Sequence, residues 1–272
     1  MTQKSKIVPD TLYKYLRIDN NFYNSILRNY IWFSDPKTFN DPYDLNISFD
    51  FNCNENLLRK YFNSIISDPV RRKELNINDT IIEEKISEFN RNPTEFINNA
   101  RENIKNIISE DYGVCCFSKN CDNLLMWSHY TDKHQGICLA YNRKIDEECF
   151  SVPYIVDYPE KYPKVNFFEC RISNNFFLSQ FLLATKSLDW QYEEEIRIIR
   201  DIGKYKNIRG EINFNKNCLT EVIFGYKIDI KKVHEIIELF TLLKFNVEFF
   251  KMDLKEYEFG LKKEKITLAN IK

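Results

Sequence analysis

An acidic segment near residue 193 has the clearest potential for chemistry. Residues 190–200 read WQYEEEIRIIR, and the β-branched second half of this segment favours a strand. Side chains alternate between the faces of a strand, so one face would carry Gln191, Glu193, Glu195 and Arg197. A carboxylate partly desolvated by Trp190 and Tyr192 is of the kind whose pKa is shifted at functional sites. The other interpretation is a solvated edge on which a glutamate pairs with Arg197, and the residues alone leave both open.

A second candidate centre is the stretch 114–140, VCCFSKNCDNLLMWSHYTDKHQGICLA, which contains two of the three histidines. His129 and His134 could supply an acid and a base, because the ordinary pKa of histidine lies close to neutral pH. Together with Cys116 and Cys121 they could instead supply four zinc ligands. Their spacing matches no paired CxxC pattern, so we predict no metal site.

Three elements should position these side chains. Residues 114–117 are expected to form a buried strand, Asp122 to cap a following helix, and residues 137–141 to form a second strand after Gly136. The helix carries apolar or aromatic residues on most sides, which predicts that it is largely buried. We therefore expect it to hold Ser128, His129 and Tyr130 in fixed positions.

The composition places limits on the class of protein. The chain has 272 residues, of which 43% are hydrophobic, and 39 basic residues balance 40 acidic ones to a net charge of -1. This balance gives no general attraction to nucleic acid or to a membrane. We find no apolar leader and no membrane-spanning run, so a cytoplasmic protein is expected. The eight cysteines lie mostly in apolar segments, which favours reduced thiols in the core, and a phosphate-binding glycine loop is lacking.

Elsewhere the pattern predicts an α+β domain spanning residues 1–272, with a central mixed or antiparallel sheet and flanking helices. Residues 53–110 change to polar helical segments and are expected to form a helical insertion. The loop at 34–43 carries turn-forming Asp-Pro steps and is either a connection or a substrate-facing segment. Strands are expected at 12–16, 31–33, 152–156, 219–224, 247–252 and 265–269, and helices at 22–28, 176–186 and 229–243.

Several short motifs occur together in this order: LYKY from Leu12, FNDP from Phe39, CFS from Cys116, LMWSHY from Leu125 followed by HQG, and W-x-Y-E-x-E-x-R from Trp190. With this ordered set, the chain resembles the bacterial domain of unknown function 2971 family. The resemblance extends over most of the chain outside the helical insertion. It implies a fold and a pattern of residues, without an assigned activity.

A looser similarity links the chain to ADP-ribosyltransferases, in which an early His or Arg, a middle Tyr or Ser and a late Glu handle NAD. At the matching positions this chain has Lys14 or Tyr15, Tyr130 or His129, and Glu195. The resemblance implies an ADP-ribosyltransferase-like fold and NAD as a substrate. Glu195 would stabilise positive charge on the ribose, Tyr15 and Tyr130 would stack on rings, and Glu193 would orient an acceptor. The implied NAD-binding residues are Tyr13, Lys14, Tyr15, Ser118, Trp127 and Arg197.

Three functional hypotheses follow. The first is an NAD-consuming transferase or glycohydrolase that acts on a protein or nucleic-acid acceptor, as a bacterial toxin or phage-defence effector would. The second is a metal-independent nuclease or phosphodiesterase in which His129 and His134 move protons, while Lys186 and Arg197 bind phosphate. The third is a scaffold in which the same residues form a buried polar network and the helices at 53–110 bind a protein partner. The enzymatic hypotheses require the segments near residues 15, 130 and 195 to meet at one cleft.

Overall fold

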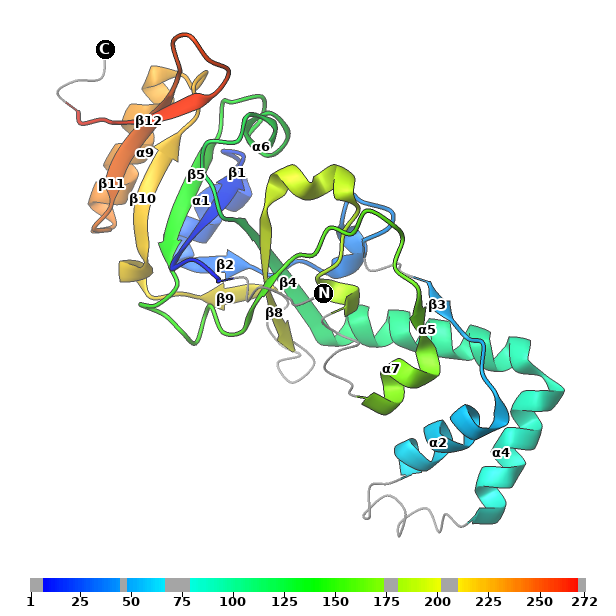
Figure 1. The fold of residues 1–272 in the computed structure, drawn as a ribbon. Coiled ribbons are helices and arrows are strands. Elements are labelled where there is room, and N and C mark those ends of the chain that lie inside the picture. The colour runs from blue at the N-terminus through cyan, green and yellow to red at the C-terminus, as the bar shows by residue number, and fades with distance from the viewer. Residues whose placement is uncertain (1–6, 45–47, 67–78, 174–180, 202–209, 269–272) are drawn as a thin grey trace. The chain divides into compact units, whose positions relative to one another are not determined.

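The fold was obtained as a computed structural model, which describes residues 7–44, 48–66, 79–173, 181–201 and 210–268 (Figure 1). The chain divides into two compact units. The first comprises Met1–Asp35, Gly113–Tyr158 and Leu188–Lys272, and the second comprises Pro36–Tyr112 and Pro159–Ser187. Each unit is described by itself below.

The first unit is built on an open sheet of eight strands, which confirms the predicted α+β class with a mixed sheet. β10 and β11 run parallel, whereas β5 pairs antiparallel with both β1 and β10. In spatial order the strands are β12 (Leu261–Lys265), β11 (Glu248–Leu254), β10 (Leu219–Phe224), β5 (Ile137–Asn142), β1 (Thr11–Leu16), β4 (Tyr112–Ser118), β8 (Glu195–Asp201) and β6 (Pro153–Ile155).

Helices cover both faces of this sheet. On one face, α1 (Asn20–Arg28) and α9 (Ile230–Leu242) bury apolar side chains such as Phe22, Ile26 and Phe240 in the main core. On the other face, α6 (Leu124–Tyr130) packs Met126 and Trp127 against Tyr15 and the neighbouring strands. The strand alternation explains this division, because successive residues of β1, β5 and β10 contribute to opposite faces.

The sheet is interrupted between its central strands β1 and β4. The paired register of these strands, both of which lie in the described part of the chain, is confined to Tyr13 and Ser118. By contrast, β1 pairs with β5 along its whole length, from Thr11 to Leu16. The second half of β1 therefore diverges from β4. After α1 the chain forms β2 (Tyr30–Trp32), which pairs with the distant β9 (Glu211–Asn213) in a small ribbon.

The second unit is mainly helical. It contains α2 (Glu55–Ile66), α4 (Asp79–Arg91), α5 (Pro93–Asp111) and α7 (Phe167–Ser173), and a short parallel pair formed by β3 (Phe49–Asp50) and β7 (Val165–Asn166). Its core is an aromatic cluster in which the rings of Tyr61, Phe96 and Phe168 contact one another. The predicted helices of residues 53–110 thus lie in this unit, together with residues 159–187.

Several local predictions differ from the structure. The segment 190–200 begins as the 3₁₀ helix η2 (Leu188–Glu193), and the strand starts only at Glu195. Glu194 adopts a φ of 43°, which breaks the alternation expected for a continuous strand. The predicted helix 176–186 lies partly outside the described residues, and Lys186 lies outside helical structure. The strand predicted at 265–269 lies partly outside the described residues, and β12 ends at Lys265, where that strand was expected to start.

The helix that carries the central motif also differs in two details. Its N-cap is Asn123 and not Asp122, because the Asn123 side chain accepts hydrogen bonds from the backbone N–H groups of Leu125 and Met126. The expectation of a largely buried helix was wrong, since Leu124, Leu125 and His129 are exposed. By contrast, Asp229 caps α9 as predicted.

Candidate functional site

A cavity of about 730 Å³ opens in the first unit beside the interrupted part of the sheet. Its lining comes mainly from β1, α1, β2 and α6, with one residue each from β5 and β9. Four predicted site residues line it together, namely Lys14, Tyr15, His129 and Tyr130. The structure therefore brings the early and middle positions of the predicted site to one cavity. The volume falls in the range of roughly 300–1,000 Å³ that is typical of small-molecule sites.

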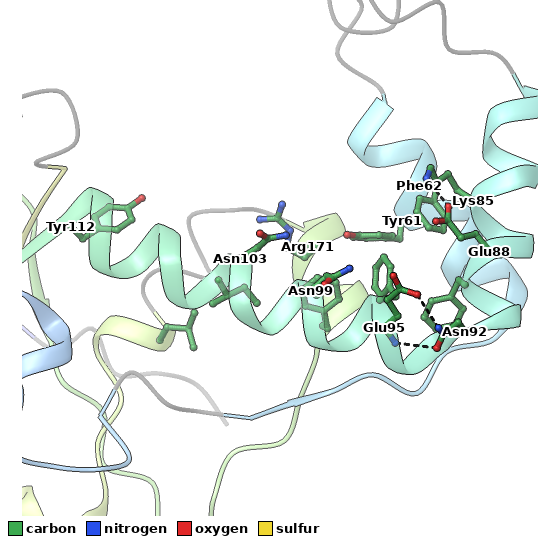
Figure 2. A pocket seen from close by; sticks show the side chains of 16 residues that line it. Tyr61, Phe62, Lys85, Glu88, Asn92, Glu95, Asn99, Asn103, Tyr112 and Arg171 are labelled. Carbon is green, nitrogen blue, oxygen red and sulfur yellow. Dashed lines mark hydrogen bonds and ion pairs between the residues drawn. The ribbon is translucent and has the colours of Figure 1, made fainter.

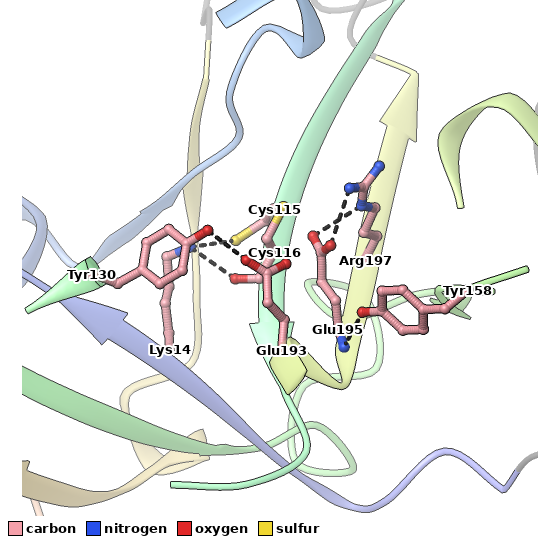
Figure 3. Close-up of polar contacts among 8 residues, drawn as sticks. All are labelled: Lys14, Cys115, Cys116, Tyr130, Tyr158, Glu193, Glu195 and Arg197. Carbon is pink, nitrogen blue, oxygen red and sulfur yellow. Dashed lines mark hydrogen bonds and ion pairs between the residues drawn. The ribbon is translucent and has the colours of Figure 1, made fainter. Parts of the chain in front are cut away.

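The Tyr130 side chain connects this cavity to the acidic segment. Its hydroxyl donates a hydrogen bond of 2.6 Å to Oε1 of Glu193, a carboxylate whose residue is only 3% exposed (Figure 3). The η2 helix is held along α6 by a further contact, in which the Asn123 side-chain amide donates to the Tyr192 carbonyl at 2.9 Å. Because both ends of α6 contact η2, the position of Glu193 relative to the cavity is fixed.

Lys14 occupies the place where β1 separates from β4. Its Nζ donates to the Cys116 carbonyl and to the Cys115 sulfur, each at 3.2 Å (Figure 3). Burial favours the neutral amine, but the sulfur atoms of Cys115 and Cys116 and the Glu195 carboxylate outweigh burial and raise the pKa of Lys14. Lys14 is therefore a cation whose ammonium group is held against β4 at the edge of the cavity.

Glu195 and Arg197 form a buried ion pair. The Arg197 guanidinium donates to the two carboxylate oxygens at 2.9 and 3.0 Å, and the Glu195 backbone N–H donates to the Tyr158 hydroxyl oxygen at 2.9 Å (Figure 3). Arg197 is 0% exposed. Neither Glu195 nor Arg197 is among the described residues that line the cavity. Glu195 therefore has its charge balanced within the fold.

The prediction that Glu193 and Glu195 share a strand face fails for a local reason. Glu193 ends a 3₁₀ helix and Glu195 begins a strand, so the alternation does not connect them. Within β8, Glu195 and Arg197 do share a face, as predicted. Glu193 thus accepts a hydrogen bond from a tyrosine hydroxyl, and Glu195 accepts two from a guanidinium.

Three other predicted site residues have contacts within the fold. The Trp127 indole is fully buried and donates to the Cys121 carbonyl at 2.7 Å. Ser118 is buried and its hydroxyl accepts the Asn120 backbone N–H. Tyr13 packs beside the α6 cluster, and burial raises its pKa. None of these three is among the described residues that line the cavity.

The histidines are not brought together in the cavity. His129 lines it, whereas His134 lies in the turn after α6 and is absent from the described lining. Burial and the nearby charge of Lys227 lower the pKa of His134. Across the described residues there is no group of three or more His, Cys, Asp or Glu side chains that could hold a metal ion. All eight cysteines are free thiols. Lys186, which the nuclease hypothesis assigns to phosphate binding, belongs to the second unit.

The structure adds residues that the sequence interpretation missed. Arg28, Tyr30 and Trp32 line the cavity from the end of α1 and from β2. The Arg28 guanidinium lies over the Tyr30 ring at 5.2 Å and is paired with Glu211. The sequence offers one signal for them, because the aromatic residues Tyr30 and Trp32 directly follow Arg28 at the end of a helix. No sequence pattern, however, indicates that these residues lie near Tyr130.

A second cavity of about 600 Å³ lies in the helical unit, along one side of α5 (Figure 2). Aromatic rings such as Tyr61 and Phe96 form part of its wall, and Arg171 points toward Tyr61. Several of its polar side chains bind one another, since Lys85 pairs with Glu88 at 2.6 Å and the Asn92 side chain donates to Glu95 at 2.8 Å. No predicted site residue lines it.

The fold and the first cavity define an α+β protein with an open mixed sheet and a small-molecule-sized cavity at a break between central strands. The model of the family described as "Protein of unknown function (DUF2971)" matches residues 126–198, which supports the family resemblance. The match includes most of the LMWSHY motif, Glu193, Glu195 and Arg197, but not β1. Searches of curated proteins and of solved structures find no match. Within the described residues, no helix is long and apolar enough to cross a membrane.

Proposed function

We propose that this protein is an NAD-consuming enzyme that resembles ADP-ribosyltransferases. NAD would bind in the cavity beside β1, and the bond between nicotinamide and ribose would break. The nicotinamide would leave with the bonding electrons, and water or a nucleophile of a protein or nucleic-acid acceptor would form the new bond to the ribose. The reaction is therefore either hydrolysis or transfer of ADP-ribose.

The contact between Tyr130 and Glu193 carries this proposal. Bond cleavage at the ribose develops positive charge, which a nearby negative group stabilises most strongly in a dry, preorganised site. Tyr130 lines the cavity, and its hydroxyl proton is directed to a buried carboxylate at 2.6 Å. The hydroxyl oxygen is thereby polarised by Glu193 and presents its lone pairs away from that bond. Tyr130 and Glu193 would act as one unit that stabilises the cationic ribose.

The remaining lining suits a dinucleotide. Lys14, Arg17 and Arg28 contribute three positive charges against the two carboxylates of Asp19 and Glu211. The excess of positive charge favours phosphate groups, and the aromatic side chains of the lining offer surfaces for the two ring systems.

Within this proposal Glu193, rather than Glu195, supplies the reacting negative charge. Glu195 is held by Arg197 through two hydrogen bonds. Glu193, Glu195 and Arg197 are all absent from the described lining of the cavity, but Glu193 accepts a hydrogen bond from Tyr130, which lines it. A charge that is already neutralised by a buried guanidinium stabilises a second cation poorly. Glu195 and Arg197 would instead support the start of β8, directly beside Glu193.

Release of nicotinamide from NAD by the purified protein tests the proposal. Protein and nucleic-acid acceptors are supplied, and ADP-ribose transfer is followed in parallel. We expect Glu193→Gln to lower the rate by about 10²–10³, the usual cost of removing one transition-state contact. Tyr130→Phe should lower it as well. Glu248→Gln is the matched control, because Glu248 is an exposed carboxylate on β11 that pairs with Lys265.

The proposal is refuted if the wild-type protein releases no nicotinamide and transfers no ADP-ribose, or if Glu193→Gln is as active as the control. Degradation of RNA in EDTA that depends on His129 would favour a nuclease instead. Unchanged activity with a lowered melting temperature in Glu193→Gln would favour a purely structural network. A role as a toxin or phage-defence effector would further require that expression lowers cellular NAD and that Glu193→Gln abolishes this effect.

A further inference from the structure

Trp32 combines partial exposure with a position at the cavity. It lies at the end of β2, it is 48% exposed, and it lines the cavity beside β1. Single exposed apolar side chains are common on protein surfaces, so the position of Trp32 at a cavity, rather than its exposure, favours a role in ligand binding. Its flat, rigid indole offers a large surface with little conformational freedom to lose.

The Trp32 indole packs directly against the backbone of Gly210. A Cβ on Gly210 would lie 2.8 Å from each of Cε2, Cζ2 and Cη2 of Trp32, so three atoms of the ring rest directly on the glycine backbone. The φ of Gly210 is +85°, a value that side-chain-bearing residues rarely adopt. The Gly210 carbonyl also accepts the Phe33 backbone N–H at 2.6 Å, which ties the glycine to the chain next to Trp32. One part of the indole is thus fixed before any ligand binds.

Charged groups beside Trp32 are also fixed. Arg28 donates to Oε1 of Glu211 at 2.8 Å, and Glu211 is the residue that pairs with Trp32 across the β2–β9 ribbon. The Arg28 side chain is nevertheless 61% exposed. A guanidinium held in this way can present its remaining N–H groups to a phosphate while its position is maintained by the carboxylate.

We propose that Trp32 is a stacking platform for a planar heteroaromatic ring of a nucleotide, with Arg28 placed to contact the attached phosphate. The inference deepens the proposed function, because it rests on the cavity taking a nucleotide such as NAD. The indole covers one face of the ring, and Gly210 holds the indole in the orientation required. Trp32 is a binding residue and takes no part in bond cleavage.

Equilibrium binding of AMP and of nicotinamide mononucleotide tests this inference without requiring catalysis. Affinities are measured by calorimetry, and quenching of tryptophan fluorescence is followed in the same titrations. The two probes distinguish which ring of a dinucleotide stacks on Trp32. We expect Trp32→Ala to weaken binding of at least one probe by roughly 5- to 150-fold, the range for loss of one base–aromatic stack.

Conservative and matched variants sharpen the test. Trp32→Phe should restore a large part of the affinity but lose the quenching signal. Gly210→Ala should weaken binding in the same direction as Trp32→Ala, because its Cβ would displace the indole. Phe259→Ala removes a fully exposed aromatic ring that does not line the cavity, and should leave binding unchanged. Thermal unfolding of each variant verifies that it is folded.

The outcomes separate this inference from the proposed function. Nucleotide binding that depends on Trp32, without cleavage of NAD, supports the platform and refutes the enzyme. Cleavage of NAD with a KM that is unaffected by Trp32→Ala supports the enzyme and refutes the platform. Equal affinities of the wild type and of folded Trp32→Ala for both probes, or no binding of either probe, likewise overturn the platform.

Discussion

Replacing Glu195 by glutamine should destabilise the fold strongly. The substitution leaves the Arg197 guanidinium, which is fully buried, without the carboxylate that receives hydrogen bonds from it at 2.9 and 3.0 Å. Removal of one partner from a buried ion pair costs about 3–5 kcal/mol in the free energy of unfolding. At roughly 2–4 °C per kcal/mol for chains of this size, the melting temperature should fall by about 6–20 °C.

The double variant Glu195→Gln/Arg197→Met separates loss of the pair from loss of one charge. Once the guanidinium is also removed, most of the lost stability should return, since apolar replacement of a buried pair is often nearly neutral. Glu248→Gln, which breaks an exposed pair with Lys265, should change the free energy of unfolding by less than about 1 kcal/mol. Chemical denaturation monitored by circular dichroism measures all three variants.

This reasoning fails if the free energy of unfolding of Glu195→Gln lies within about 1 kcal/mol of the wild-type value. In that case the pair would be weak or solvated, and Glu195 would be available for the role that the sequence resemblance implied. It also fails if the double variant is no more stable than Glu195→Gln. Because Glu195→Gln is expected to impair folding, loss of NAD cleavage in this variant alone would not identify Glu195 as catalytic.

Three further predictions concern the turn after α6. Burial and the charge of Lys227 lower the pKa of His134 in the folded state. The protein should therefore lose stability as the pH falls below about 6.5, the ordinary histidine pKa. In thermal unfolding measured at several pH values, His134→Asn should reduce this loss. Lys133→Gly should raise the free energy of unfolding by about 0.5–1 kcal/mol, because Lys133 has a φ of 57° that glycine adopts more easily. Gly136→Ala should destabilise the fold by more than about 2 kcal/mol, since its Cβ would lie 2.2 Å from the Leu16 carbonyl oxygen; a wild-type melting temperature would contradict this.

Elements with a strong local signal could be predicted from the sequence. The strand at 219–224 and the helix that follows Asp229 occur as expected, because hydrophobic spacing and a capping aspartate both act locally. The secondary structure of the segment 190–200 is harder to predict from the sequence, because β-branched residues occur only in its second half. Contacts with α6 hold residues 188–193 in a 3₁₀ helix, and no local propensity reports such tertiary contacts.

The candidate site could be predicted in part, because some of its residues belong to recognisable motifs and others depend on long-range contacts. Lys14, Tyr15, His129 and Tyr130 meet at one cavity, and their motifs had been identified in the sequence. Trp32 was missed because its role depends on Gly210, which is far away in sequence and touches it through the β2–β9 ribbon. The break in strand alternation between Glu193 and Glu195 occurs at Glu194, whose positive φ composition does not encode.

The position of β1 at the centre of the sheet separates its synthesis from its pairing. Leu12 must wait for its partner Tyr141, whereas β10 and its parallel neighbour β11 are separated only by α9. Contacts between residues close in sequence form fastest, so the β10–α9–β11 segment should gain protected amides before β1 does in pulse-labelled refolding. On the ribosome the order would differ, because β5, the partner of β1, is synthesised before β10 and β11.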